Sequence, residues 1–192
     1  MFIETETTPN PASLKFLPGQ QVMGQGTREF ATPEAAEASP LAQAIFDIGE
    51  VVNVFFGGDF VTVTAAPGVN WTDLKPQVLV ILLDHFVAQA PLFTPGSAGG
   101  IAVPPEEEML VDERDEDSDI IAQINELLET RVRPAVAGDG GDIQYRGYRD
   151  GIVHLQMQGA CSGCPSSTAT LKHGIEGLLK HYVPEVVEVR AA

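Results

Sequence analysis

The chain has two cysteines, and both lie in one C-x-x-C motif formed by Cys161 and Cys164. Two thiols at this spacing can hold one edge of a metal site or close a tight redox disulfide. The surrounding text, CSGCPSS, is small and polar, which argues against two inert cysteines packed in a core. Structural zinc sites and iron–sulfur clusters usually take four ligands, so one chain supplies half of such a site. A second copy related by a two-fold axis supplies the other half.

The same spacing also fits a catalytic dithiol of the thioredoxin type, which is the usual interpretation of C-x-x-C in a cytosolic protein near a strand and a helix. Such a site usually has an aromatic residue beside the motif and follows a buried strand. Here the motif follows Gln158-Gly159-Ala160, and the strand text before it, HLQMQ, alternates between polar and apolar residues. The spacing by itself leaves the metal and redox hypotheses open.

Hydrophobic periodicity predicts the elements that carry the motif. The first is a helix capped by Ser118 and ended near Pro134, followed by a turn over 138–142 and strands over 143–148 and 152–158. A helix then begins at Pro165, with Tyr182 on its core face, and a last strand covers 186–189. This α-β-β-α-β order puts the cysteine loop between a strand and a helix. Cys164 falls at about the N-cap of that helix, where unpaired amides and the helix dipole lower a thiol pKa.

The first half of the chain predicts a separate α+β unit. Its expected elements are a strand over 13–17, a helix that begins after Ser39-Pro40, a hairpin over VVNVFF and FVTVT, and a helix with an apolar stripe over 74–86. This half has no cysteine, and its one histidine, His85, is expected on a helix surface rather than as a ligand.

Charge separates the two halves. Residues 106–130 carry 11 acidic side chains and 1 basic one, and the text over 91–118 is rich in Pro, Gly and carboxylates. Self-repulsion and the lack of apolar surface favour an extended linker there. The predicted fold class is therefore α+β, with a domain over 1–88, an acidic linker over 89–117 and a second domain over 118–192.

Composition narrows the function classes. With 11 Lys and Arg against 27 Asp and Glu, the net charge is −16, so electrostatic binding to nucleic acid or an anionic membrane is not expected. Two cysteines exclude a disulfide-rich secreted scaffold. The chain starts with MFIETETTPNP, without a basic leader, and its longest apolar run is too short to cross a bilayer. We therefore expect a cytoplasmic protein.

Two stretches resemble a known family. Residues 118–192 resemble the C-terminal domain of the NifU family, the Nfu-type iron–sulfur scaffold proteins, through Arg133-Pro134, the DGGDI text over 139–143 and GACSGCPSSTATLKHGIE. Residues 1–88 resemble the domain that precedes it in many Nfu proteins, through TPNPASLKF and FFGGDFVTVT. The resemblance covers both domains and leaves only the linker unmatched.

The resemblance implies a function. Cys161 and Cys164 match the family's paired ligands, which bind a 4Fe–4S cluster shared between two subunits. It implies a homodimer in the cluster-bound form, apo iron–sulfur proteins as acceptors and upstream assembly factors as donors. The protein is then a carrier and not an enzyme. The family's signature over Asp139–Asp142 is interpreted as a turn that positions the hairpin, with glycines at positive φ.

Overall fold

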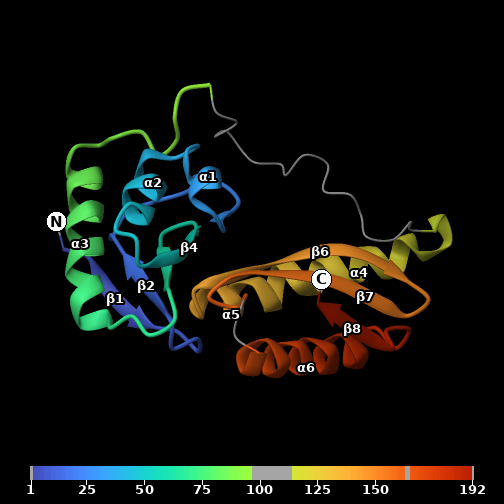
Figure 1. Ribbon diagram of the computed structural model, residues 1–192. Helices are drawn as coiled ribbons and strands as arrows, with labels where there is room; N and C mark the ends of the chain where they lie inside the picture. The colour runs from blue at the N-terminus through green and yellow to red at the C-terminus, as the bar shows by residue number, and fades with distance from the viewer. Residues whose placement is uncertain (1, 97–113, 163–164, 192) are drawn as a thin grey trace. The chain divides into compact units, whose positions relative to one another are not determined.

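A computed structural model describes residues 2–96, 114–162 and 165–191. The chain forms two compact units, Met1–Val103 and Pro104–Ala192, and each is described by itself (Figure 1). Both units combine helices with a β-sheet, so the predicted α+β class is confirmed.

The first unit is built on a five-stranded antiparallel sheet. Its elements are β1 (Glu4–Thr7), β2 (Ser13–Leu17), β3 (Arg28–Phe30), α1 (Pro33–Ala36), α2 (Pro40–Phe46), β4 (Val51–Phe56), β5 (Val61–Ala65) and α3 (Trp71–Val87). The strand order is β1-β2-β5-β4-β3. The hairpin β4–β5 and the strand β2 were predicted. The strands β1 and β3 and the helix α1 were not, because each has four residues or fewer and none shows a sustained period.

The core of the first unit lies between this sheet and the helices. Val54 and Phe56 on β4 are fully buried there. Helix α3 adds four buried side chains spaced by four residues: Leu74, Val78, Leu82 and Phe86. The hydroxyl of Ser39 accepts a hydrogen bond from the amide of Ala42 and so caps α2, as the Ser-Pro pair predicts.

The chain that follows α3 continues onto the first unit. The hydroxyl of Ser39 donates to the carbonyl of Leu92 at 2.5 Å. The amide of Thr94 donates to the carbonyl of Ala38 at 3.0 Å. The start of the expected linker over 89–117 therefore packs against the helices, and 97–113 of that linker lie outside the described residues.

The second unit has a three-stranded sheet of mixed direction. Its elements are a 3₁₀ turn η1 (Asp115–Asp117), α4 (Ser118–Leu127), a π turn η2 (Leu128–Val132), α5 (Arg133–Gly138), β6 (Gly141–Arg149), β7 (Ile152–Gly159), α6 (Pro165–Tyr182) and β8 (Glu188–Ala191). Strand β7 pairs antiparallel with β6 and parallel with β8. Figure 1 shows α4 and α5 running along the long hairpin β6–β7. The core joins side chains of these helices, the sheet and α6, among them Ile124, Val136, Ile143, Leu155, Ile175 and Leu179.

The first helical segment differs from the prediction at both ends. Ser118 is the first helical residue rather than the cap, and Asp117 takes the N-cap position. Pro134 does not end the helix, because helical backbone continues through α5 to Gly138. The π turn over 128–132 ends two residues before the proline and widens the helix there. That widening accommodates a residue that lacks an N–H and whose ring crowds the preceding turn.

Two further predictions need correction. Tyr182 is not on the core face of α6: its side chain is exposed, and the guanidinium carbon of Arg131 lies 5.0 Å from the ring centroid. The sequence pattern gives Tyr182 helical spacing with the core residues, but the buried row at this end of α6 continues from Leu179 to Val183, and Tyr182 falls beside that row. The predicted turn over 138–142 is shorter, since β6 already begins at Gly141.

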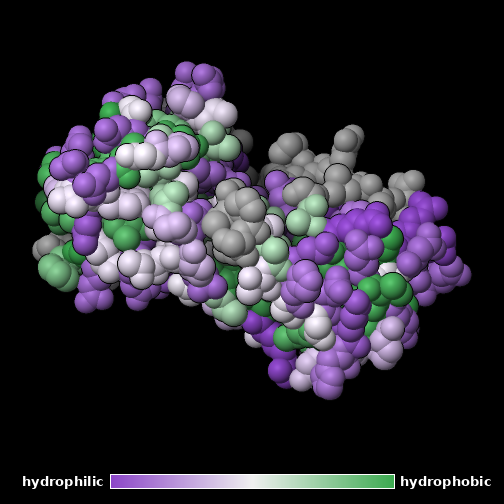
Figure 2. Space-filling view, turned by 60° about the horizontal axis from the view of Figure 1, so that its bottom comes forward, coloured by the Kyte–Doolittle hydropathy of each residue, from purple (hydrophilic) through white to green (hydrophobic). Residues whose placement is uncertain are grey.

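Exposed apolar side chains are scattered. Those with the largest exposed fractions include Phe2, Val80, Val87 and Val187. On the face drawn in Figure 2, hydrophobic residues lie in small groups between hydrophilic ones. Such single side chains are normal on folded proteins. Among the described residues, none of the helices is both long and apolar enough to span a bilayer.

Candidate metal-binding site

Cys161 lies in the short loop that connects β7 to α6. The backbone around it is held from both sides. The amide and the hydroxyl of Ser162 donate to the carbonyl of Gly159, at 3.1 Å and 2.9 Å. The hydroxyl of Thr168, in the first turn and a half of α6, donates to the carbonyl of Cys161 at 3.0 Å. Ser162 therefore closes the loop against the end of β7. Cys164 lies outside the described residues.

The thiol of Cys161 is buried. The residue is 5% exposed and belongs to the second core, although the small, polar text around the motif argued against a cysteine packed in a core. The reason is a close approach to β6: a Cβ added at Gly141 would lie 2.8 Å from the Cys161 Sγ and 2.5 Å from the Gln158 carbonyl oxygen. The absence of a side chain at Gly141 makes the space that the sulfur fills.

The surroundings of Cys161 disfavour its thiolate. Burial, with a smaller contribution from the negative charges of Asp139 and Asp142, raises the pKa of the Cys161 thiol to about 12. The sequence-based expectation of a lowered pKa concerned Cys164, which is not described. A thioredoxin-type nucleophile needs a low thiol pKa and solvent access. Cys161 has neither, and the redox hypothesis is not favoured.

A buried sulfur of this kind still fits a soft metal. A coordinated cation takes the place of the thiol proton and compensates the charge that burial penalises. Among the described residues, no group of three or more His, Cys, Asp or Glu side chains could hold a metal ion.

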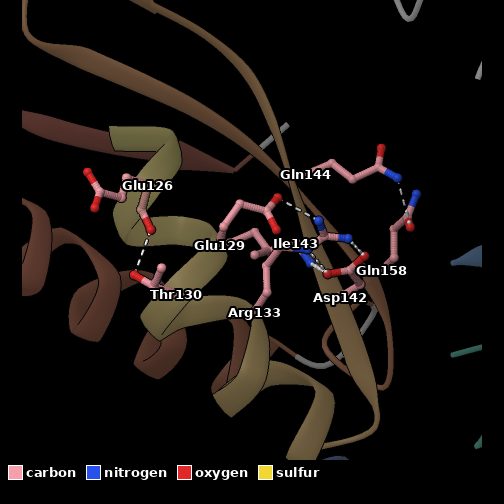
Figure 3. Close-up of polar contacts among 8 residues, drawn as sticks. All are labelled: Glu126, Glu129, Thr130, Arg133, Asp142, Ile143, Gln144 and Gln158. Carbon is pink, nitrogen blue, oxygen red and sulfur yellow. Dashed lines mark hydrogen bonds and ion pairs between the residues drawn. The ribbon is translucent and has the colours of Figure 1, made fainter. Parts of the chain in front are cut away.

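The acidic and glycine residues over 139–142 have a structural explanation in their contacts. Gly140 has φ 82°, the left-handed conformation that the turn interpretation expects, whereas Gly141 in β6 is without positive φ. Asp142 is 3% exposed and accepts two hydrogen bonds from Arg133, Nε to Oδ1 at 2.9 Å and Nη2 to Oδ2 at 2.7 Å (Figure 3). These bonds hold the pKa of the Arg133 guanidinium above its usual range. Arg133 also donates to the exposed carboxylate of Glu129 at 2.6 Å.

The other polar residues take structural positions. His173 on α6 is exposed, and its Nδ1 lies 2.9 Å from the carbonyl oxygen of Ala169. Tyr148 is buried in the second core, and Tyr145 is partly buried against it. In the first unit, His85 is half-buried beside a cavity of about 350 Å³, and burial lowers its pKa.

Comparisons with known proteins match both units. The family described as "Scaffold protein Nfu/NifU N terminal" matches residues 3–89, and "NifU-like domain" matches residues 124–190. The human protein named "NFU1 iron-sulfur cluster scaffold homolog, mitochondrial" is 47% identical over 97% of this chain and 70% of its own length. This chain belongs to the Nfu/NifU family. "NifU-like protein 4, mitochondrial" of Arabidopsis thaliana is 50% identical over 97% of this chain and 64% of its own length.

A solved relative covers part of the chain. The solution NMR structure of a NifU-like protein from Saccharomyces cerevisiae is 28% identical and covers 48% of this chain and 84% of that chain, with a TM-score of 0.44. This family member spans 64% of the Arabidopsis relative and 70% of the human one.

The names of the relatives correct one expectation. Those of Arabidopsis and human are called mitochondrial, so the predicted cytoplasmic location is wrong. The prediction relied on the acidic start of the chain. Compartment is set by a targeting signal and not by the folded domains, so charge at the start of this chain cannot decide it.

Proposed function

We propose that this Nfu/NifU family member is an iron–sulfur cluster carrier. In this proposal Cys161 and Cys164 of two copies of the chain hold one 4Fe–4S cluster between them, and the dimer passes the cluster to apo-proteins. Upstream assembly factors supply it. The protein chemically transforms no substrate, so it acts as a carrier and not as an enzyme.

The observation that carries the proposal is the number and placement of thiols. The chain has two cysteines, at the junction of β7 and α6 in the unit that matches the NifU-like domain. Four thiolates are the usual ligand set of a 4Fe–4S cluster, and two copies of a C-x-x-C supply four. The printed name of the human relative, an iron–sulfur cluster scaffold homolog, supports the same assignment.

Release is as important to a carrier as binding. Two thiolates from each chain leave the cluster at an interface, where thiols of an acceptor can replace them one at a time. Each released Cys161 thiolate takes up a proton, because its buried site favours the neutral thiol. We propose that this preference for the protonated sulfur assists unloading.

The first test is iron and acid-labile sulfide per chain after anaerobic reconstitution, with molar mass measured on the same sample. About two irons and two sulfides per chain in a dimer match a bridged four-iron cluster. About one iron per chain points to a bridged two-iron cluster and overturns the cluster type. No iron in a chain with reduced thiols overturns the carrier proposal. Cys161→Ser is the matched control and is expected to lose the cluster.

A second test addresses transfer. Activation of an apo iron–sulfur protein by the loaded dimer is compared with activation by equal amounts of free iron and sulfide. A carrier is expected to be faster and to resist a chelator present in solution. Equal rates would contradict the transfer step while leaving cluster binding intact.

A further inference from the structure

A buried ion pair joins α5 to the start of β6. The carboxylate of Asp142 has both oxygens engaged: Oδ1 accepts from the Arg133 Nε at 2.9 Å and from the Ile143 amide at 2.8 Å, and Oδ2 accepts from the Arg133 Nη2 at 2.7 Å. The side chain of Asp142 is 5% exposed and that of Arg133 31%. Figure 3 shows the guanidinium reaching across from its helix to the strand. Paired, planar hydrogen bonds of this kind fix geometry as well as charge.

The segment held by this ion pair contacts the cysteine loop directly. Gly141, which precedes Asp142, lies so close to the Cys161 Sγ that a Cβ on it would be 2.8 Å away. One residue earlier, the carbonyl of Gly140 accepts a hydrogen bond from the Ala160 amide at 3.2 Å. The two residues before Asp142 thus contact Cys161 and the residue before it.

We infer that Arg133 and Asp142 are positioning residues for Cys161. The ion pair holds Gly140 and Gly141 in place, and these two glycines fix the path of the backbone and the space for the sulfur. Neither charged residue is a ligand in this inference. Their role for a bound cluster rests on the proposed function, but their effect on Cys161 does not.

The position of the Arg133–Asp142 ion pair connects it specifically to the sulfur of Cys161. Loss of the guanidinium fork removes two charge-assisted hydrogen bonds from a buried carboxylate, and such a group tends to move toward water. Movement of Asp142 shifts the adjoining glycines, and the sulfur packed against them follows. An ion pair elsewhere in the unit lacks this connection. Arg190 and Glu188 form one on β8 through two hydrogen bonds, at 3.0 Å and 3.2 Å, with both side chains exposed.

The test uses the full chain without metal and with Cys164→Ser, so that Cys161 is the single thiol. The rate of its alkylation by iodoacetamide is measured at fixed pH, with Arg133→Lys as the variant and Arg190→Lys as the matched control. Lysine keeps the positive charge but cannot make the planar fork. Arg133→Lys is expected to alkylate about tenfold faster, the factor that loss of a charged hydrogen bond allows. The control is expected to react at the parent rate.

A merely structural role gives a different result. If Arg133→Lys only lowers global stability, alkylation proceeds through the unfolded state, and its rate rises steeply with small additions of urea. Displacement within the folded state instead gives a rate that low urea does not change. A rate equal to that of the parent, or a steep dependence on urea, overturns the inference.

A second variant covers failure of Arg133→Lys to fold. Asp142→Glu keeps the charge and moves the carboxylate by one methylene, and it is expected to speed alkylation in the same way. In the chain that keeps Cys164 and has iron bound, either variant is expected to lose its cluster to a chelator on the order of 10- to 100-fold faster, as supporting-residue changes do at other metal sites. If the parent chain itself binds no iron, the proposed function fails. The alkylation rates of the metal-free chain still decide whether Arg133 and Asp142 position Cys161.

Discussion

Gly141→Ala tests the close approach that houses the sulfur of Cys161. The added methyl carbon would lie 2.5 Å from the carbonyl oxygen of Gln158, and ordinary contact begins at 3.4 Å. The difference, 0.9 Å, must come from the backbone of β7, since the Gln158 carbonyl belongs to a strand paired with β6. Overpacking of this kind costs about 1–3 kcal/mol. Replacing glycine with alanine returns about 0.4–1 kcal/mol through the unfolded chain.

The net expectation is a loss of roughly 1–2 kcal/mol in the second unit, which lowers its melting temperature by about 4–16 °C. Gly138→Ala is the control, because nothing lies within 4 Å of a Cβ added at this last residue of α5 and its φ is not positive. Alanine there is expected to leave the melting temperature unchanged or to raise it.

The aromatic residues allow each unit to be followed separately. Trp71, the single tryptophan, lies in the first unit, and all three tyrosines, Tyr145, Tyr148 and Tyr182, lie in the second. Thermal unfolding of the metal-free chain is recorded by tryptophan fluorescence and by tyrosine near-ultraviolet circular dichroism. The tyrosine transition of Gly141→Ala is expected to move and the tryptophan transition to stay. A tyrosine transition at or above the parent temperature would refute the close-approach argument.

Three further predictions concern charge, packing and capping. Burial raises the pKa of the Cys161 thiol from 9.0 to about 12. The stability that the neutral thiol adds is therefore complete below pH 9 and is lost as pH rises toward 12. Between pH 8 and 10, the urea midpoint of the tyrosine signal should fall by more in the parent than in Cys161→Ala. Leu82→Ala removes a fully buried side chain of α3 and should destabilise the first unit by about 2–5 kcal/mol. Its control, Val80→Ala, changes a position that is 57% exposed and should alter the free energy of unfolding by less than about 0.5 kcal/mol. Equal denaturation midpoints for the two variants would contradict the assigned helix face. Ser39→Ala removes both the cap of α2 and the hydrogen bond to the Leu92 carbonyl. The free energy of unfolding followed by tryptophan fluorescence should fall by about 1–3 kcal/mol. An unchanged denaturation midpoint would contradict the assigned role of Ser39.

Local patterns in the sequence were sufficient for much of the fold. The Ser39-Pro40 pair, the turn at Gly57-Gly58 and the apolar stripe of α3 each act within a few residues, and each predicted its element. The family resemblance likewise followed from contiguous text around Cys161 and Cys164. The short strands β1 and β3 were missed because their pairing partners, β2 and β4, supply the hydrogen bonds that define them.

The sequence by itself determined that two thiols share one stretch between a strand and a helix, and that the chain carries half of the thiols of a four-thiolate site. Only the tertiary structure decided how that loop is held. Arg133 and Asp142 are nine residues apart and meet because the chain reverses at Gly140. Cys161 is buried because β6 brings Gly141 against its sulfur. Periodicity reports which face of an element is apolar, but it carries no information about contacts between elements, and those contacts set the burial and the pKa of the thiol.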